Sequence, residues 1–436
     1  MKTTTLLGLG SLLVLIPFHA VAANWPQWRG PFFNGSTTDK NLPETWSKTK
    51  NVLWAAPLPG QGHATPAVWD DYVFVTSPDP DKNLLLICLD RKDGKVRWQK
   101  VVGVGDKVVG RNNMASPSPV TDGKTVWVMF GTGDIAAYDF AGNQLWARNL
   151  CKEYGRFAIM WLYGSSPLLY KDRLYIEDLQ RLDGGGRYSG GGDGKTELQS
   201  FLLCLDPKTG KNIWKHDRVS DAVGESQESY TTPIPSELNG RSEIVVAGGD
   251  YVTGHDPKTG EELWRGGGLN NTQHRGDSRL VPSPVMADGM VFVNGPKRNP
   301  LLAYRDGGKG DITASGLAWT YAEYPTDCPT PLIYKGKLFV LDGDKQMMTC
   351  MDPKSGAVAW KQSLGTREIF RASPTGADGK IYCLSEDATA VVMSAVDGKI
   401  LSTIKMDEGQ THATIVASHG CLFVRAAQHL YCIGKK

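Results

Sequence analysis

A short hairpin motif, written repeatedly along the chain, most constrains what this sequence can fold into. In its clearest copy, Leu203–Trp214, an apolar strand leads to Asp206, a Thr-Gly pair closes a turn, and a second strand carries Trp214. Asp bonds back to the amides of the turn, and Gly supplies the positive φ that the reversal needs. Because the Trp has a large flat surface to bury, the motif predicts a hairpin that packs against a neighbouring unit.

The motif closes a longer repeat of about 40–50 residues with four short strands, which is typical of propeller blades. Each repeat opens with a Ser/Thr-Pro pair, and the last opening lacks the Pro. The predicted openings are Thr65-Pro66, Ser116-Pro117, Ser166-Pro167, Thr232-Pro233, Ser283-Pro284, Thr330-Pro331, Ser373-Pro374 and Ala413-Thr414-Ile415. The fifth copy separates Asp306 from Trp319 by an insertion, and the seventh has lost its Trp.

The eighth repeat supplies strands at 411–417, 421–426 and 429–433 but no fourth strand. The strand at 51–58, which carries Trp54, has no turn motif before it and fits that vacancy. A ring closed in this way leaves no open sheet edge. The sequence therefore predicts an all-β, eight-bladed propeller with four-stranded antiparallel blades, closed by an N-terminal strand that joins the C-terminal blade. The tryptophans predicted to dock one blade on the next are Trp54, Trp98, Trp146, Trp214, Trp264 and Trp360.

The N-terminus predicts export. Lys2, an apolar run from Leu6 to Phe18 and the small residues 20–23 form a secretory signal peptide over 1–23, too short for a membrane span. No Cys follows the cleavage site, so a lipid anchor is not expected, and the destination is the periplasm or the exterior. An N-terminal extension, 24–50, precedes a single propeller domain, 51–436, with a Gly-rich loop inserted at 180–197. The two Trp of the extension should be buried at the side or base of the ring.

Charge and cysteine content exclude several classes of protein. Lys and Arg total 48 against 46 Asp and Glu, so a nucleic-acid partner has no electrostatic support. No cysteine pair or Cys/His cluster has zinc spacing, so no metal site is predicted from these residues. Cys421 and Cys432 face each other across a short hairpin, and we expect free thiols there.

The hairpins resemble the pyrroloquinoline quinone (PQQ) repeat, whose pattern is Ala-x-Asp-x-x-Thr-Gly-x-x-x-Trp. Residues 205–214 and 255–264 match closely, and 350–360 and 89–98 are near matches. The opening Trp-Pro-Gln-Trp-Arg-Gly-Pro also looks like the N-terminus of secreted PQQ-binding-like propellers. The resemblance covers essentially the whole mature chain, but it specifies fold more than function.

The resemblance points to two branches. Quinoprotein alcohol dehydrogenases hold PQQ and Ca²⁺ in the mouth of an eight-bladed ring, whereas BamB-like propellers bind protein partners and no quinone. This chain lacks the adjacent Cys pair and the haem Cys-x-x-Cys-His of the dehydrogenases, and it lacks the lipid-anchored Cys of BamB. It fits neither branch fully.

Candidate ligand residues lie about two positions before each opening pair, where the innermost strands begin at the channel mouth. Arginines would grip carboxylates or sulfates, a carboxylate would act as base or Ca²⁺ ligand, and histidine would transfer protons. The alternative interpretation is that these residues only hydrate a water-filled channel. The candidate acids and bases are Asp327, Glu228, His63 and His412, and the candidate cofactor-binding residues are Arg279, Arg371, Asn113 and Trp161.

Three functions follow from these residues. The leading interpretation is an exported, non-enzymatic scaffold that binds a small molecule or an envelope protein, with no cofactor assigned. The alternative is a PQQ/Ca²⁺-dependent dehydrogenase that oxidises an alcohol or sugar. A carbohydrate-binding or carbohydrate-processing propeller with its site at the same mouth is the third.

Overall fold

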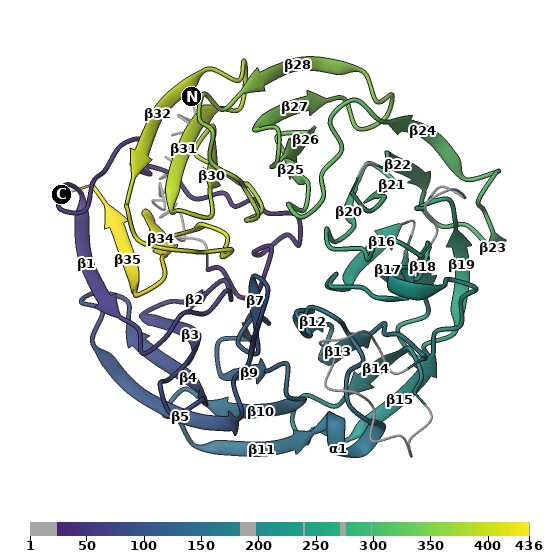
Figure 1. Ribbon diagram of the computed structural model, residues 1–436, viewed down its shortest axis with the longest axis horizontal. Coiled ribbons are helices and arrows are strands. Elements are labelled where there is room, and N and C mark those ends of the chain that lie inside the picture. The colour runs from purple at the N-terminus through teal and green to yellow at the C-terminus, as the bar shows by residue number, and fades with distance from the viewer. Residues whose placement is uncertain (1–23, 184–197, 239, 271–275, 298, 436) are drawn as a thin grey trace, which may run out of the picture.

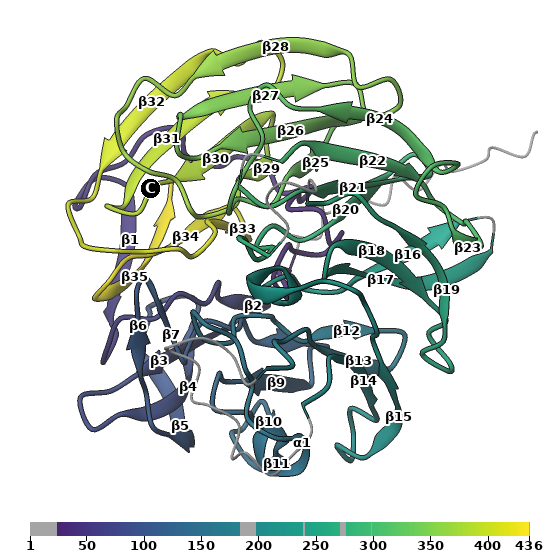
Figure 2. The same ribbon diagram turned by 45° about the vertical axis from the view of Figure 1, so that its right-hand side comes forward.

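The computed structural model describes residues 24–183, 198–238, 240–270, 276–297 and 299–435. Most of the Gly-rich loop and the predicted signal peptide lie outside these residues. The described chain forms eight antiparallel sheets arranged around a central channel (Figure 1), as the repeats predict. The chain returns to its starting blade, so β1 and β35 lie side by side in both views (Figures 1 and 2).

Each blade begins at the channel and ends on the outside of the ring. From the innermost strand outward, the first four blades are β2 to β5 (Ala67–Trp69, Tyr72–Pro78, Asn83–Asp90, Val96–Val104), β8 to β11 (Val120–Thr121, Thr125–Met129, Asp134–Asp139, Gln144–Asn149), β12 to β15 (Leu168–Tyr170, Arg173–Asp178, Phe201–Leu205, Asn212–Asp217) and β16 to β19 (Ile234–Leu238, Arg241–Gly248, Tyr251–His255, Glu262–Gly266). The short elements α1 (Leu150–Tyr154), η1 (Gly224–Gln227) and the ribbon of β6 (Val108–Val109) and β7 (Asn112–Asn113) connect blades.

The other four blades follow the same plan. They are β20, β21, β22 and β24 (Val285–Ala287, Met290–Asn294, Leu301–Arg305, Leu317–Tyr321), β25 to β28 (Leu332–Tyr334, Lys337–Asp342, Met347–Met351, Val358–Ser363), β29 to β32 (Thr375–Ala377, Lys380–Leu384, Thr389–Ser394, Ile400–Lys405) and, in the eighth, β33, β34 and β35 (Val416–Ser418, Cys421–Arg425, His429–Gly434) with β1 (Val52–Pro57) outside them. The insertion in blade five adds β23 (Gly310–Asp311), which pairs in parallel with β19.

The eighth blade confirms the predicted closure. Strand β1 pairs antiparallel with β35, with Trp54 opposite Cys432 and Pro57 opposite His429. The N-terminal strand therefore completes the blade that the C-terminal strands begin, and the outer edge of that blade is built from the opposite end of the chain. All eight cysteines, Cys421 and Cys432 included, are free thiols. Within the described ranges, no helix is long and apolar enough to cross a membrane.

The hairpin tryptophans join neighbouring blades by one repeated contact. Trp214 donates its indole N–H to the Pro257 carbonyl at 3.2 Å, and a Cβ on Gly260 would touch its ring at 2.6 Å. The turn Gly is therefore required because the neighbouring indole lies against it. The same pairing of an indole with a carbonyl just after the turn Asp of the next blade is made by Trp54, Trp98, Trp146 and Trp319, and Trp360 bonds the equivalent turn of blade seven.

Trp264 departs from this prediction. Its indole N–H donates to Glu243 Oε2 at 2.5 Å within its own blade, and the ring is completely buried. The insertion in blade five replaces the tight turn on which this ring would dock, and Ile312 from that insertion packs in the same cluster. Trp319, beyond the insertion, then resumes the docking pattern against blade six.

A ring of hydroxyl groups joins the innermost strands. In seven of the eight junctions, the backbone N–H of one opening Ser or Thr donates to the hydroxyl of the corresponding residue in the next blade, at 2.8 to 3.1 Å. The ring corrects the predicted opening of blade two, because Ser118-Pro119 occupies the position assigned to Ser116-Pro117. The eight hydroxyl residues are Thr65, Ser118, Ser166, Thr232, Ser283, Thr330, Ser373 and Thr414.

Candidate functional site

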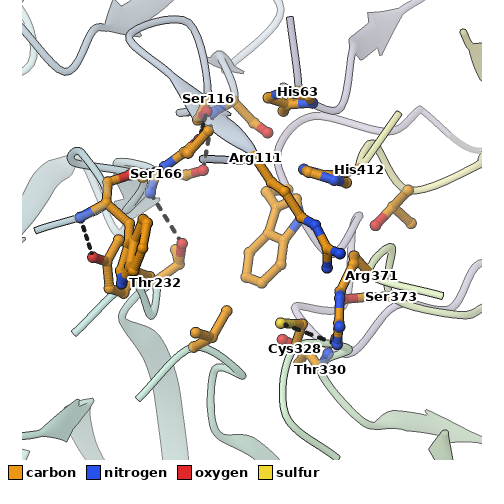
Figure 3. A pocket seen from close by; sticks show the side chains of 18 of the residues that line it. His63, Arg111, Ser116, Ser166, Thr232, Cys328, Thr330, Arg371, Ser373 and His412 are labelled. Atoms are coloured by element: carbon orange, nitrogen blue, oxygen red, sulfur yellow. Dashed lines mark hydrogen bonds between the residues drawn. The ribbon is translucent and has the colours of Figure 1, made fainter. Parts of the chain in front are cut away.

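A cavity of about 460 Å³ occupies the channel where the innermost strands begin (Figure 3). Its wall follows one register rule: the residue two positions before each hydroxyl of the ring lines it. Successive inner strands bring equivalent positions to the same height around the channel, so a repeat with one register presents eight side chains to one space. These residues are His63, Ser116, Gly164, Tyr230, Val281, Cys328, Arg371 and His412.

The cavity wall contains some of the predicted site residues and not others. His63, Arg279, Asp327, Arg371, His412 and Trp161 line the cavity, whereas Asn113 and Glu228 do not. Asn113 is buried, and its side-chain amide donates to the Gln61 carbonyl at 2.6 Å. If the residue two positions before the ring hydroxyl had been taken in every blade, with Ser118 as the hydroxyl of blade two, Ser116 and Tyr230 would have been predicted in place of Asn113 and Glu228. Sequence reasoning also missed Trp28, Gly164, Val281, Cys328, Arg111 and Asn112.

Positive charge dominates the cavity wall. Three guanidinium groups line it, from Arg111, Arg279 and Arg371, and Asp327 is the single carboxylate among its described lining residues. Arg371 lies 2.7 Å from Asp344, and Arg111 lies 3.6 Å from Glu386, but neither acid lines the cavity. The neutralising acids thus lie mostly outside the cavity, and its inner surface favours an anion.

Asp327 sits between two of these arginines. Its Oδ1 is 3.5 Å from Arg279 Nη1, and its Oδ2 is 3.9 Å from Arg371 Nη1. The backbone N–H of Lys297 also donates to Oδ1, at 3.2 Å. Two cations and an amide face this carboxylate, so it braces the arginines.

Two stacked histidines form the neighbouring wall (Figure 3). The rings of His63 and His412 are 4.2 Å apart and inclined by 21°. Burial lowers the pKa of His63 well below its usual range, and the nearby His412 and Arg425 lower it further. His63 is therefore a neutral imidazole at neutral pH, and its Nδ1 has no hydrogen-bond partner in the structure. His412 Nε2 lies 3.0 Å from Glu386 Oε1, which fixes the orientation of the second ring.

Hydrogen bonds from Trp161 and from the residue before it hold Trp161 against the cavity. Its indole N–H donates to Glu225 Oε1 at 3.1 Å, and its backbone N–H donates to the Tyr230 hydroxyl at 2.9 Å. Glu228 accepts the preceding amide, from Met160, at 2.9 Å, and it accepts the Tyr230 hydroxyl at 3.2 Å. Burial raises the pKa of Glu228 to about 7. Glu228 thus supports the loop behind Trp161, and it is not placed to contact a ligand.

Cys328 is the one thiol on the cavity wall among the described residues. Its Sγ lies 3.7 Å from Asp327 Oδ2 and 3.8 Å from Arg371 Nη1. Burial and, to a smaller extent, the adjacent Asp327 carboxylate raise the pKa of this thiol to about 12, against the opposing effect of Arg371 and Arg279. A thiol with this pKa is protonated at neutral pH, so the arrangement does not favour a thiolate nucleophile.

The residues of the cavity wall suit the carboxylates of PQQ better than they suit its calcium ion. Calcium takes six to eight oxygen ligands, but the described residues contain no group of three or more His, Cys, Asp or Glu side chains that could hold a metal ion. Asp327 is already engaged by two arginines. The three arginines of the wall do suit a ligand with several carboxylates. The wall therefore fits an organic anion, and toward calcium its described side chains offer a single carboxylate, that of Asp327.

Comparison with known proteins gives the family. The family model described as outer membrane protein assembly factor BamB, a PQQ-repeat model, matches residues 36–176, 198–330 and 311–427. The chain belongs to this family of PQQ-repeat propellers. The crystal structure of BamB from Moraxella catarrhalis is similar, with a TM-score of 0.59 and 12% identity over 88% of this chain and 96% of that one. A europium-containing methanol dehydrogenase superposes with a TM-score of 0.67 and 11% identity over 93% and 90% of the two chains. Both structural likenesses concern the fold.

Sequence relatives include two kinds of enzyme. Tetrathionate hydrolase of Acidithiobacillus ferrooxidans is 21% identical in an alignment 389 positions long, which covers 73% of this chain and 69% of the hydrolase. Methanol dehydrogenase subunit 1 of Methylorubrum extorquens is 26% identical over 160 residues, 33% of this chain. The match spans only 21% of that dehydrogenase. The chain is thus related to BamB and to enzymes that share the propeller.

Proposed function

We propose that this protein is an exported, non-enzymatic propeller that binds a small anionic ligand in its central cavity. One observation carries the proposal: three guanidinium groups and two imidazoles face a cavity that one carboxylate lines. A volume of about 460 Å³ is in the range of small-molecule sites. Export is supported by the predicted signal peptide and by a family model named for assembly at the outer membrane.

The lining chemistry supports binding more than turnover. Asp327 is engaged by Arg279 and Arg371, and the Cys328 thiol is protonated at neutral pH because burial raises its pKa to about 12. His63 remains available as a neutral proton acceptor, but no positioned nucleophile or acid stands opposite it among the described lining residues. Tight binding by the arginines needs none of these groups to react.

An oxidoreductase or hydrolase function is the second candidate. The three arginines would hold the carboxylates of PQQ, and methanol dehydrogenases are among the relatives. The missing calcium ligands argue against dehydrogenase chemistry at this site. Tetrathionate, the substrate named for another relative, is also a small dianion, so the same charge surplus would suit it. Binding of protein partners, after the BamB likeness, would use other surfaces of the ring.

The test is calorimetric titration of the purified protein with PQQ, with and without Ca²⁺, and with tetrathionate and citrate. Gly164 offers a sharp variant, because a Cβ there would meet only Tyr230 and Asn112 at 3.6 and 3.7 Å. Gly164→Leu should narrow the cavity enough to exclude the larger anions, PQQ and citrate, without unfolding the protein. Arg371→Ala should weaken binding at least tenfold, and Arg305→Ala, an exposed arginine on blade five, should not.

Each outcome separates the candidates. Binding that is Ca²⁺-independent, blocked by Gly164→Leu for PQQ and citrate, and unaccompanied by dye reduction or thiosulfate release is expected. Dye reduction with an alcohol in the presence of PQQ and Ca²⁺ would establish the dehydrogenase, and cleavage of tetrathionate would establish the hydrolase. Binding of PQQ or citrate that persists in Gly164→Leu would place the ligand elsewhere on the molecule.

A further inference from the structure

The N-terminal Trp-Pro-Gln-Trp-Arg-Gly motif runs through the channel instead of covering the outside of the ring. Trp25 and Val68 exchange two backbone hydrogen bonds of 2.8 Å, and the Thr121 amide donates to the Pro26 carbonyl at 2.8 Å. These bonds tie the motif to the innermost strands of blades one and two. In Figure 1 the purple N-terminal segment crosses the middle of the ring.

Arg29 anchors the motif on the other side of the channel. Its guanidinium donates to the Pro331 carbonyl at 2.8 Å and to the Pro374 carbonyl at 3.1 Å, in blades six and seven. The side chain is buried, and this burial lowers its pKa to about 9. Both carbonyls follow hydroxyl residues of the inner ring, so the anchor lies at the level of the cavity.

The backbone around the anchor is held in an unusual conformation. Arg29 and Gly30 have φ values of 68° and 74°, in the left-handed region that side chains other than Gly rarely adopt. A Cβ on Gly30 would meet the Trp25 ring at 3.0 Å. Such a turn persists where the surroundings determine it, and here it sends Trp25 into the core while Trp28 reaches the cavity.

We propose that Trp28 is a ligand-contacting residue that makes the cavity select anions with a flat apolar body. Trp28 lines the same cavity as Arg279 and Arg371, so one site offers guanidinium groups for charge and an indole surface for stacking. The bonds of Trp25, Pro26 and Arg29 to four blades hold this indole in place before a ligand arrives. The inference rests on the proposed anion-binding function and specifies its ligand class.

Two probes of equal charge test the inference. Benzene-1,3,5-tricarboxylate is flat, and cis-cyclohexane-1,3,5-tricarboxylate carries the same three carboxylates on a puckered ring. Calorimetric titration of the wild type should give a dissociation constant about five- to tenfold lower for the flat probe, the size of one aromatic stacking contact. Trp28→Ala should bring the ratio of the two constants close to one.

Further variants separate the effect of the flat Trp28 ring from effects on folding and on charge. Trp28→Phe should retain most of the preference, and Trp28→Leu, which keeps an apolar side chain without a flat ring, should lose it even if Trp28→Ala folds poorly. Phe32→Ala removes a half-exposed aromatic ring from the same segment and should leave the ratio unchanged. Arg371→Ala should weaken both probes by the same factor.

Different results would refute the role of Trp28 and the proposed anion binding. If both probes bind in an Arg371-dependent manner but Trp28→Ala and Trp28→Leu keep the wild-type ratio, the role of Trp28 is refuted and anion binding stands. If the wild type binds neither probe and none of the anions tested above, both proposals are refuted together. Equal affinity of the wild type for the two probes likewise refutes the selection of flat anions.

Discussion

Replacing Trp54 with Ala should loosen the ring at its closure. Trp54 lies on β1, the strand that the N-terminal end contributes to blade eight. Its indole is buried, donates to the Arg91 carbonyl at 2.8 Å and lies on Gly94 of blade one. The substitution therefore removes the contact that fastens the last blade to the first.

The expected magnitude follows from these contacts. Truncating a buried Trp to Ala costs about 3–5 kcal/mol in the free energy of unfolding. For a chain of 436 residues, an unfolding entropy of about 2.1 cal/mol/K per residue gives about 0.9 kcal/mol per degree. Trp54→Ala should consequently lower Tm by about 3–6 °C in differential scanning calorimetry.

Trp98→Ala is the matched control. Trp98 makes the same contact, with a 2.9 Å bond to the Phe140 carbonyl, but it lies on a strand that belongs to a continuous blade. Amide hydrogen exchange should show β1 opening faster in Trp54→Ala and unchanged in Trp98→Ala. Unchanged exchange of β1 in both variants, with an equal loss of Tm, would refute the argument that Trp54 latches the ring.

Two further predictions concern the hydroxyl ring and pH. Thr330→Val leaves the Ser283 amide without its acceptor and should lower the free energy of unfolding, measured in urea, by about 1–3 kcal/mol. Thr403→Val, at an exposed site, should leave the free energy of unfolding almost unchanged. Equal effects of the two substitutions would refute a structural role of the hydroxyl ring. Glu228 has a pKa of about 7 in the fold against about 4.3 when unfolded, so the native state retains a proton that the unfolded state has lost. Unfolding free energy should therefore decline as pH rises from about 4.5 to about 7, and Glu228→Gln should remove part of that decline. A wild-type slope retained in Glu228→Gln would show that this carboxyl does not titrate as argued.

The repeated motif was enough to predict the architecture because its parts act locally. Asp206 and its Thr-Gly pair make a turn in any setting, and Trp214 needs only the next turn to dock on. The orphan strand with Trp54 predicted the closure because an unpaired edge in blade eight would be costly. The hydrogen bond of Trp264 departs from the pattern because an insertion opens the turn of the next blade, although its ring still packs in one cluster with residues of blade five.

The cavity was only partly predictable. The offset from the opening pair found Arg371 and His412, but a second Ser-Pro pair in blade two hid the register and brought in Asn113. Glu228 and Tyr230 are two positions apart, and a constant offset of two residues from Thr232 selects Tyr230, which lines the cavity. The offset cannot find Arg111 or Trp161, because these residues lie on connections between blades.

Trp28 was the least predictable member of the site. Its neighbour Arg29 bonds the carbonyls of Pro331 and Pro374, 302 and 345 residues away in sequence, and nothing in the repeat specifies where an irregular extension lies. The sequence signal that could have identified Trp28 is the concentration of Trp, Arg and Gly in so short a segment. An extension that only lies on the surface does not need so many large side chains.

The most direct test of the account is the position of an anion in a crystal. Crystals of the wild-type protein soaked in bromide, measured at the bromine absorption edge, should show an anomalous peak in the central cavity beside Arg279 and Arg371, and the peak should be weaker in Arg371→Ala. Bromide found only on the outer surface, with none in the channel, would contradict the claim that this propeller holds anions at its centre.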